Sequence, residues 1–250
     1  MKKACLFIFF TFFILTPLSF GAMIEVDEVI ESTQSIRAWE KSSGKALWRS
    51  EVAVQKGDGF IFVLEEGRGI YGNDKQNRNW RTESFFHHNN KQIVPYQTKY
   101  ILKDEKGDIV TKLDKYFDAK DKQVVCIIDE KTKRYVFVDD LLERSALGIV
   151  LPHFPFVRGK EISQHLLTHE PAMYKVNFKP LGQETVEAGA ESIECYKLEM
   201  TVDLGALNII GAFVPKTYFW YNVKSPHRFV RYEGLESGLG TPYIVMQVDS

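Results

Sequence analysis

Two histidines, His165 and His169 in the run HLLTHE, have a spacing that could serve a metal ion. On a helix, imidazoles four residues apart share one face, as in many zinc sites. The flanking pattern and Pro171 favour a strand, however, and four residues along a strand separate two side chains by about 13 Å. A catalytic zinc also needs a third protein ligand, which the sequence does not place. We therefore expect no cofactor, and keep a metal-dependent enzyme centred on these histidines as a third hypothesis.

Nucleophilic catalysis has less support than metal chemistry. The run Gly234–Gly238 (GLESG) lacks the glycine spacing of a serine nucleophile elbow, and a strand is predicted after it where a helix is required. Cys126 and Cys195 both lie in apolar runs, where a thiol is not activated. In an oxidising compartment the two could form a disulfide, and two separate buried thiols are the alternative. We therefore expect a protein that is not an enzyme.

Three strand-like runs near the end of the chain are separated by proline and glycine residues and predict an antiparallel meander. They are Thr217–Val223, Arg228–Glu233 and Tyr243–Val248. Arg231 and Glu233 share one face of their strand. We interpret them as part of a cross-strand ion pair that fixes register, with an anion-binding site as the alternative. Phe219 and Trp220 are adjacent, so their rings point to opposite faces and at least one must be covered.

The rest of the chain repeats a strand-and-turn pattern that is typical of an all-β sandwich or barrel. Leu47–Gln55 alternates apolar with polar residues, and Asp129–Thr132 is the turn of a predicted hairpin. Gly67 and Gly69 are expected to break the strand that starts at Phe60.

One short helix is predicted after Asp140, which resembles an N-cap with Glu143 as the acidic residue at the third helical position. Gly148 would end this helix. The stretch Ile149–Val157 follows and is too apolar for an idle surface loop. We therefore predict a mainly β fold with a single curved antiparallel sheet, a half barrel of about ten or more strands, closed by one short helix and an apolar loop.

Residues 1–21 have the features of a secretory signal peptide. Lys2 and Lys3 precede an apolar core, Leu6–Leu15, and small residues such as Gly21 follow it. The core is short for a transmembrane helix, and an uncleaved membrane anchor is the alternative. We expect one domain over residues 22–250, exported to the periplasm, with the extracellular space as the alternative.

The charge of the chain limits the class of partner. Loss of Lys2 and Lys3 leaves 30 basic against 33 acidic residues, a net charge of −3. Charges of both signs are interspersed, so nucleic acid is not an expected partner. No second apolar stretch approaches the roughly 20 residues that span a bilayer, so we expect no transmembrane segment after processing. The oligomeric state stays open.

Aromatic residues make up 13% of the chain and cluster within strands. Large rings on both faces of a strand require a covered face or a cavity. Our first hypothesis is therefore a non-enzymatic binding or carrier protein for an apolar or amphipathic ligand, such as a lipid, an acyl chain or a lipoprotein. Its predicted lining residues are Trp220, Phe219, Leu147 and Phe154. The alternative is a cell-envelope assembly or interaction protein that works through its sheet edges.

Several stretches resemble a family of exported bacterial β proteins of unknown function. They are Gly182–Met200, KTYFWY (216–221), PHRFVRYEG (226–234), GTPYIVM (240–246), and the earlier SGKALWRSEV and DLLERSALG. That family is similar in shape to the half barrels of the lipoprotein carriers LolA and LolB. The resemblance covers most of the chain after the signal peptide. It implies an antiparallel sheet curled around one or more short helices, with an apolar concave face and no catalytic residues.

Overall fold

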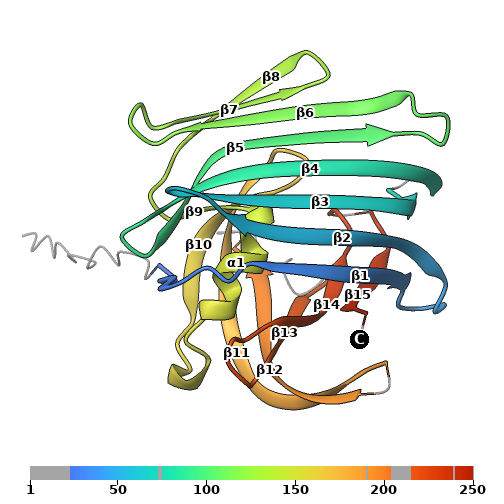
Figure 1. The fold of residues 1–250 in the computed structure, drawn as a ribbon, viewed down its shortest axis with the longest axis vertical. Helices are drawn as coiled ribbons and strands as arrows, with labels where there is room; N and C mark the ends of the chain where they lie inside the picture. Colours follow the sequence, from blue (N-terminus) through green and yellow to red (C-terminus); the bar gives the residue numbers. More distant parts are fainter. Residues whose placement is uncertain (1–22, 73–74, 190, 204–214, 239, 250) are drawn as a thin grey trace, which may run out of the picture.

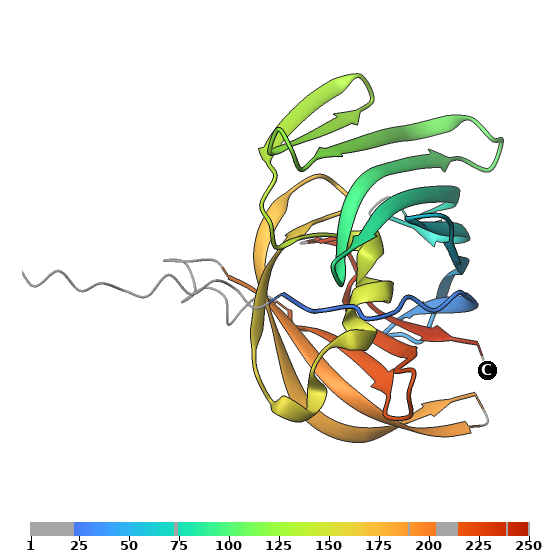
Figure 2. The same cartoon turned by 60° about the vertical axis from the view of Figure 1, so that its left-hand side comes forward.

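A computed structural model describes residues 23–72, 75–189, 191–203, 215–238 and 240–249. The predicted signal peptide, residues 1–21, lies outside the described residues. The described chain forms one large sheet that curls around a short helical segment, which is yellow in Figures 1 and 2. Among the described residues, no helix is both long enough and apolar enough to span a bilayer.

The sheet has fifteen strands, and the predicted class of a curved, mainly antiparallel β fold is confirmed. In chain order the strands are β1 (Ser32–Glu40), β2 (Ala46–Lys56), β3 (Phe60–Tyr71), β4 (Gln76–Asn89), β5 (Gln92–Lys103), β6 (Ile109–Asp118), β7 (Gln123–Ile128), β8 (Lys131–Val136), β9 (Leu141–Glu143), β10 (Ile162–Leu167), β11 (Met173–Ala188), β12 (Glu191–Val202), β13 (Thr217–Asn222), β14 (Phe229–Leu235) and β15 (Tyr243–Val248).

The order of strands across the sheet shows how the two ends of the chain meet. From one edge it runs from β8 down to β1, then from β15 down to β9. The first and last strands are therefore neighbours, with Ile36 opposite Val248. All pairs are antiparallel except β9 with β10. The edges of the sheet are thus β8 and β9, which lie close together in the chain (Figure 1).

Alternation along the strands decides which side chains enter the curve. In β2, Trp48 and Ser50 are buried while Arg49 and Glu51 are exposed. We call the face that points toward residues 144–158 the inner face, and the opposite one the outer face.

The predicted break at Gly67 and Gly69 is wrong, because β3 continues through both glycines. A β-carbon at position 67 would lie 2.0 Å from the ring of Trp80, and one at position 69 would lie 2.4 Å from the carbonyl oxygen of Leu47. The glycines therefore make room for close neighbours within the sheet and do not end the strand.

The helical segment begins later than predicted. Leu141–Glu143 is strand β9, and the helical turns are η1 (Arg144–Ala146), α1 (Leu147–Val150), η2 (Leu151–His153) and η3 (Phe156–Arg158). Glu143, and not Asp140, caps the first turn by accepting a hydrogen bond from the backbone N–H of Ser145. The α-helix runs through Gly148, which was expected to end it. Leu142 belongs to one apolar cluster and Leu141 to another. Both faces of the edge strand β9 are therefore covered, and both leucines are buried.

Side chains join the two edges of the sheet where backbone pairing does not. Lys115 of β6 donates to Glu143 of β9 at 2.8 Å and to the carbonyl of Thr168 at 2.8 Å. Tyr135 of β8 donates to the carbonyl of Pro171. The sheet is therefore drawn toward closure by polar contacts between its ends.

The two cysteines are free and lie in different clusters. Cys126 packs with the inner residues of the β1–β7 half, and Cys195 packs on the outer face with Trp220 and Val230. Of the two alternatives left open by the sequence, the structure shows two separate buried thiols.

Candidate functional site

Three of the four predicted lining residues meet on the inner face. Phe219 and Phe154 are buried in one apolar cluster, and Leu147 packs against it. Phe219 comes from β13, while Leu147 and Phe154 come from the helical segment, so the contact joins the segment to the sheet. This is the arrangement that a lid over an apolar site would have.

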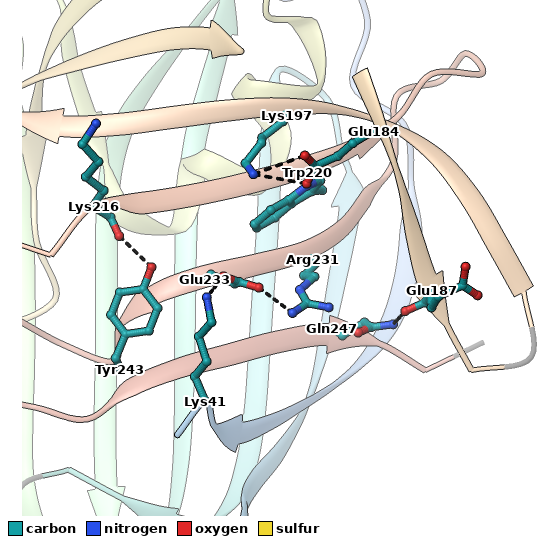
Figure 3. Close-up of polar contacts among 10 residues, drawn as sticks. All are labelled: Lys41, Glu184, Glu187, Lys197, Lys216, Trp220, Arg231, Glu233, Tyr243 and Gln247. Carbon is teal, nitrogen blue, oxygen red and sulfur yellow. Dashed lines mark hydrogen bonds and ion pairs between the residues drawn. The ribbon is translucent and has the colours of Figure 1, made fainter. Parts of the chain in front are cut away.

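Trp220 lies on the outer face and shares no lining with the other three (Figure 3). Its indole N–H donates to Glu184 at 2.6 Å, and Lys197 and Arg231 lie over its ring at 5.0 and 5.7 Å. With 3% of its surface exposed, Trp220 is covered, as is Phe219 at 6%. The prediction that the two rings point to opposite faces is confirmed.

The predicted cross-strand ion pair takes a different form. Arg231 pairs with Glu233 of its own strand, β14, and Lys41, which follows β1, provides a second cation for the same carboxylate (Figure 3). Burial would raise the pKa of Glu233, but the two cations outweigh burial and lower it. These charges satisfy one another, so the pair leaves no cation free for a ligand.

The two histidines considered as metal ligands have separate environments. His165 of β10 lies 2.8 Å from the carboxylate of Asp140, whereas His169, beyond the strand, packs edge-on against the ring of Tyr100 at 4.0 Å. No group of three or more histidine, cysteine, aspartate or glutamate residues within the described parts of the chain could hold a metal ion. The structure therefore gives His165 and His169 different partners and does not bring them together at one site.

The most unusual feature of the interior is a group of polar side chains around Arg144, which we call the Arg144 site. Its members interact electrostatically with one another and come from β3, β14, the turns that follow β10 and β14, and the helical segment: Glu65, Tyr71, Arg144, His169, Tyr232 and Glu236. Arg144 directly follows the buried Glu143 at the start of the helical segment and is itself half-buried. The sequence analysis did not single out any of these residues except His169.

The two carboxylates of the Arg144 site are held by donors other than the arginine. Glu236 accepts from the indole N–H of Trp48 at 2.7 Å and from the backbone N–H of Gly72 at 3.1 Å. Glu65 accepts from the indole N–H of Trp80 at 3.3 Å. No hydrogen bond or ion pair joins the side chain of Arg144 to any residue that the structure describes. Its donors are available to another molecule.

Aromatic rings form the walls of the Arg144 site. Tyr71 stacks on Trp80 at 4.8 Å between ring centroids, and Trp48 meets both edge-on, at 6.5 Å from Tyr71 and 5.5 Å from Trp80. These rings restrict the motion of the indoles that hold the two carboxylates. The polar groups of the site are therefore preorganised by packing.

Burial and neighbouring charges set the protonation states. Burial raises the pKa of Tyr71 and of Tyr232 to about 12, so both are neutral donors at pH 7. Burial, followed by the charges of Arg144 and Lys115, lowers the pKa of His169 well below its usual value, so the imidazole is neutral. Burial would lower the pKa of Arg144, but its electrostatic interactions with Tyr71 and Glu65 outweigh burial and raise that pKa. The guanidinium is therefore charged at pH 7, as arginine is throughout the physiological range. The site therefore combines the cation of Arg144 with two carboxyl groups, two neutral phenols and a neutral imidazole.

Other polar atoms of the interior also lack partners within the described residues. Nε2 of His169, Oγ of Ser50 and Oε1 of Gln164 are shielded from solvent and have no hydrogen bond. Ser50 and Gln164 are 6% and 3% exposed and lie in β2 and β10 among inward-facing residues. Most buried polar groups in proteins are satisfied, so a set of unsatisfied ones indicates a place for water or a ligand.

One signal in the sequence could have found Arg144. It stands in the otherwise apolar stretch Leu141–Phe156, where Glu143 is the other charge. A charge inside such a stretch needs a partner or a function. The other residues of the Arg144 site have no comparable signal in their local sequence, because they come together from distant parts of the chain.

No protein-family model matches the chain, and no curated protein matches its sequence. Among solved structures, the chain is similar to a β-barrel-like protein of a domain of unknown function, DUF1849, from Brucella abortus, with a TM-score of 0.55 and 8% identity over 88% of this chain and 96% of that chain. The hypothetical lipoprotein YmcC from Escherichia coli K12 aligns over 87% of this chain and 83% of that chain with a TM-score of 0.30 and 6% identity. The first of these likenesses shows a shared β-barrel-like fold and nothing beyond it.

Proposed function

We propose that the protein is an exported binding or carrier protein that holds an amphipathic ligand inside its curved sheet. The acidic head of the ligand pairs with Arg144, and its apolar part lies against the cluster that contains Phe219. The observation that carries the proposal is that the guanidinium of Arg144 has no hydrogen bond or ion pair to a described residue. The two carboxyl groups of the Arg144 site accept hydrogen bonds from Trp48, Trp80 and Gly72 instead.

The head-binding part of the proposal follows from the cost of a half-buried cation that has no ion pair. Partial removal from water is unfavourable for a charge unless it is paired, so such an arginine is a natural receptor for a carboxylate or phosphate. The neutral phenol of Tyr71 interacts with Arg144 and supplies a further donor, whereas the hydroxyl of Tyr232 already donates to the carbonyl of Leu235 at 2.7 Å. A ligand that brings one negative charge would complete this set.

The tail-binding part rests on the contact between the helical segment and the sheet. Phe154 lies in the same apolar cluster as Phe219, and Leu147 packs against that cluster. An acyl chain or lipoprotein tail would take the place of these side chains by moving the segment away from the sheet. Apolar burial of roughly 25 cal/mol per Å² provides the attraction, before the costs of association are subtracted.

Lipid extraction is the first test. The full chain is expressed with its signal peptide in a bacterial host, purified, extracted with organic solvent and examined by mass spectrometry. We expect a co-purifying amphipathic acid. An empty protein that also fails to bind a dansyl-labelled fatty acid would overturn the proposal.

A comparison of charged and uncharged ligands tests the role of Arg144. The wild-type protein should bind a fatty acid about tenfold to a hundredfold more tightly than its methyl ester, as expected for one charge-assisted hydrogen-bonded pair. Arg144→Met should bind both alike. The matched control is Arg81→Met, which removes an arginine from the outer face of β4, where it pairs with Glu66 and Glu83. Loss of the preference in the control would contradict the assignment.

The proposal that the sheet edges recruit a partner has less support. The edge strand β8 carries Lys131, Lys133 and Arg134, all exposed. Lysine-rich edge strands resist pairing with another strand. The interior of the sheet is therefore the better candidate for binding.

A further inference from the structure

The outer face of the sheet borders a groove of about 930 Å³, which shares Trp48 with the walls of the Arg144 site but none of that site's polar members. It lies over β1 to β4, with a contribution from Glu105 after β5. The side chains that the argument uses are Arg37, Trp39, Arg49, Arg68, Asn77 and Asn79. None of them takes part in the function proposed above.

Three arginines of this groove stand directly opposite one another on adjacent strands. Arg37 of β1 is paired in register with Arg49 of β2, and Arg49 with Arg68 of β3. The row continues with Asn79 of β4 and Lys103 of β5. Adjacent strands lie about 4.8 Å apart, so the three guanidinium groups extend from a line about 10 Å long. We call Arg37, Arg49 and Arg68 the arginine row.

Like charges that lie directly opposite each other on adjacent strands destabilise a sheet. The arginine row therefore needs a role that outweighs this cost. Arg49 and Arg68 are exposed, and neither forms an ion pair within the described parts of the chain. Arg37 has its Nε 3.2 Å from a carboxylate oxygen of Asp249 and lies over the ring of Trp39 at 5.8 Å. One acid for three cations leaves a local excess of positive charge in a protein whose overall charge is slightly negative.

Side chains beside the arginine row add an aromatic ring and amide groups to the groove. Trp39 provides a flat apolar surface at one side, and Asn77 and Asn79 provide amide donors and acceptors at the other. Glu105 also borders the groove, but its carboxylate accepts a hydrogen bond from Asn77, which fixes it at that end. Cations, a ring and amides together suit a polar ligand that carries concentrated negative charge.

We propose that the arginine row binds the phosphoryl group or groups of a ligand taken up from solution. A phosphoryl group has three oxygens and more than one negative charge, so it can bridge adjacent guanidinium forks that a single carboxylate would leave partly unpaired. A membrane surface fits less well, because Glu51 and Glu66 stand opposite each other in the next row of the same face. An extended anionic surface would meet these carboxylates, whereas a compact ligand within the groove would not.

Calorimetric titration with inorganic pyrophosphate tests this proposal. We expect the wild-type protein to bind pyrophosphate, with affinity that falls as salt rises, and the double variant Arg49→Gln/Arg68→Gln to bind at least tenfold more weakly. The thermal midpoint of the double variant should equal or exceed that of the wild type, because a repulsion is removed, which shows that the loss is not caused by misfolding.

The charge-matched control is Lys133→Gln/Arg134→Gln on β8, which removes two exposed cations far from the groove in the sheet order. Unchanged binding in this control supports a specific site. Equal weakening in the control would show that only the net charge matters and would overturn the proposal. The absence of pyrophosphate binding, or binding only to vesicles that contain phosphatidylglycerol, would also overturn it.

Discussion

Nζ of Lys115 lies 2.8 Å from Oε1 of Glu143, and neither side chain is open to solvent, with 0% and 1% of their surfaces exposed. This ion pair joins β6 to β9, near the two edges of the sheet. Glu143 also caps the first turn of the helical segment through Ser145. One buried pair therefore links the closure of the sheet to the position of the segment that carries Arg144.

The first prediction concerns the loss of this pair. Lys115→Met should lower the free energy of unfolding by about 3–5 kcal/mol, because it leaves the carboxylate of Glu143 buried without a cation. The double variant Lys115→Met/Glu143→Gln should lose less than the single variant. Urea unfolding measures both. Lys112→Met, which removes a largely exposed lysine of the same strand, should change stability by less than about 0.5 kcal/mol. A single variant as stable as the wild type would contradict the pair's role.

The second prediction separates function from stability at Arg144. Arg144→Met should cost less than about 1 kcal/mol or stabilise the ligand-free protein, because it removes a cation that has no internal ion pair. Urea unfolding of delipidated protein is the measurement. A loss greater than about 2 kcal/mol would show that Arg144 is mainly structural, and the proposed head-binding role would then lose its basis.

The general form of the sheet could be predicted from sequence because strands have a local period of two. Trp48, Val52 and Val54 alternate with Arg49, Glu51 and Gln55 in β2. The turn at Asp129 separates β7 from β8 as expected. The opposite directions of Phe219 and Trp220 follow from the same period.

The Arg144 site could not be predicted in this way, because no local period brings its residues together. Glu65, Arg144 and Tyr232 belong to elements that meet only when the sheet curls. The start of the helical segment was wrong for a related reason. Leu141 and Leu142 fit a helix face as well as a strand, and only the covering of both faces of β9 decides between them.

The third prediction follows from the ring of Trp80 over Gly67. Gly67→Ala should destabilise the protein by about 1–3 kcal/mol, because its β-carbon would overlap the indole and displace it from Tyr71. Near-ultraviolet circular dichroism should report the displaced ring. Gly57→Ala is the control, since a β-carbon there would lie 4.0 Å from the carbonyl oxygen of Phe60, an ordinary contact distance. Equal effects of the two substitutions would contradict the packing argument.

The fourth prediction concerns thiol reactivity. Burial raises the pKa of Cys126 and of Cys195 to about 11, so little thiolate is present at pH 8. The folded protein should therefore react slowly with Ellman's reagent, and two thiols per processed chain should react after denaturation in guanidinium. Reaction of fewer than two thiols in the unfolded chain would show that the cysteines are joined in a disulfide in the cell.

The fifth prediction is that stability falls as the pH falls below about 6.5, the usual pKa of histidine in an unfolded chain. Burial and the charges of Arg144 and Lys115 lower the pKa of His169 in the folded protein, and burial also lowers that of His153. Below pH 6.5 the unfolded chain therefore binds protons that the folded protein excludes, and each fully excluded proton lowers the free energy of unfolding by about 1.4 kcal/mol per pH unit. Urea unfolding between pH 5 and 7 measures this slope. His169→Gln should flatten it, and the additional change His153→Gln should flatten it further, whereas an unchanged slope in His169→Gln would show that the imidazole is protonated inside the fold.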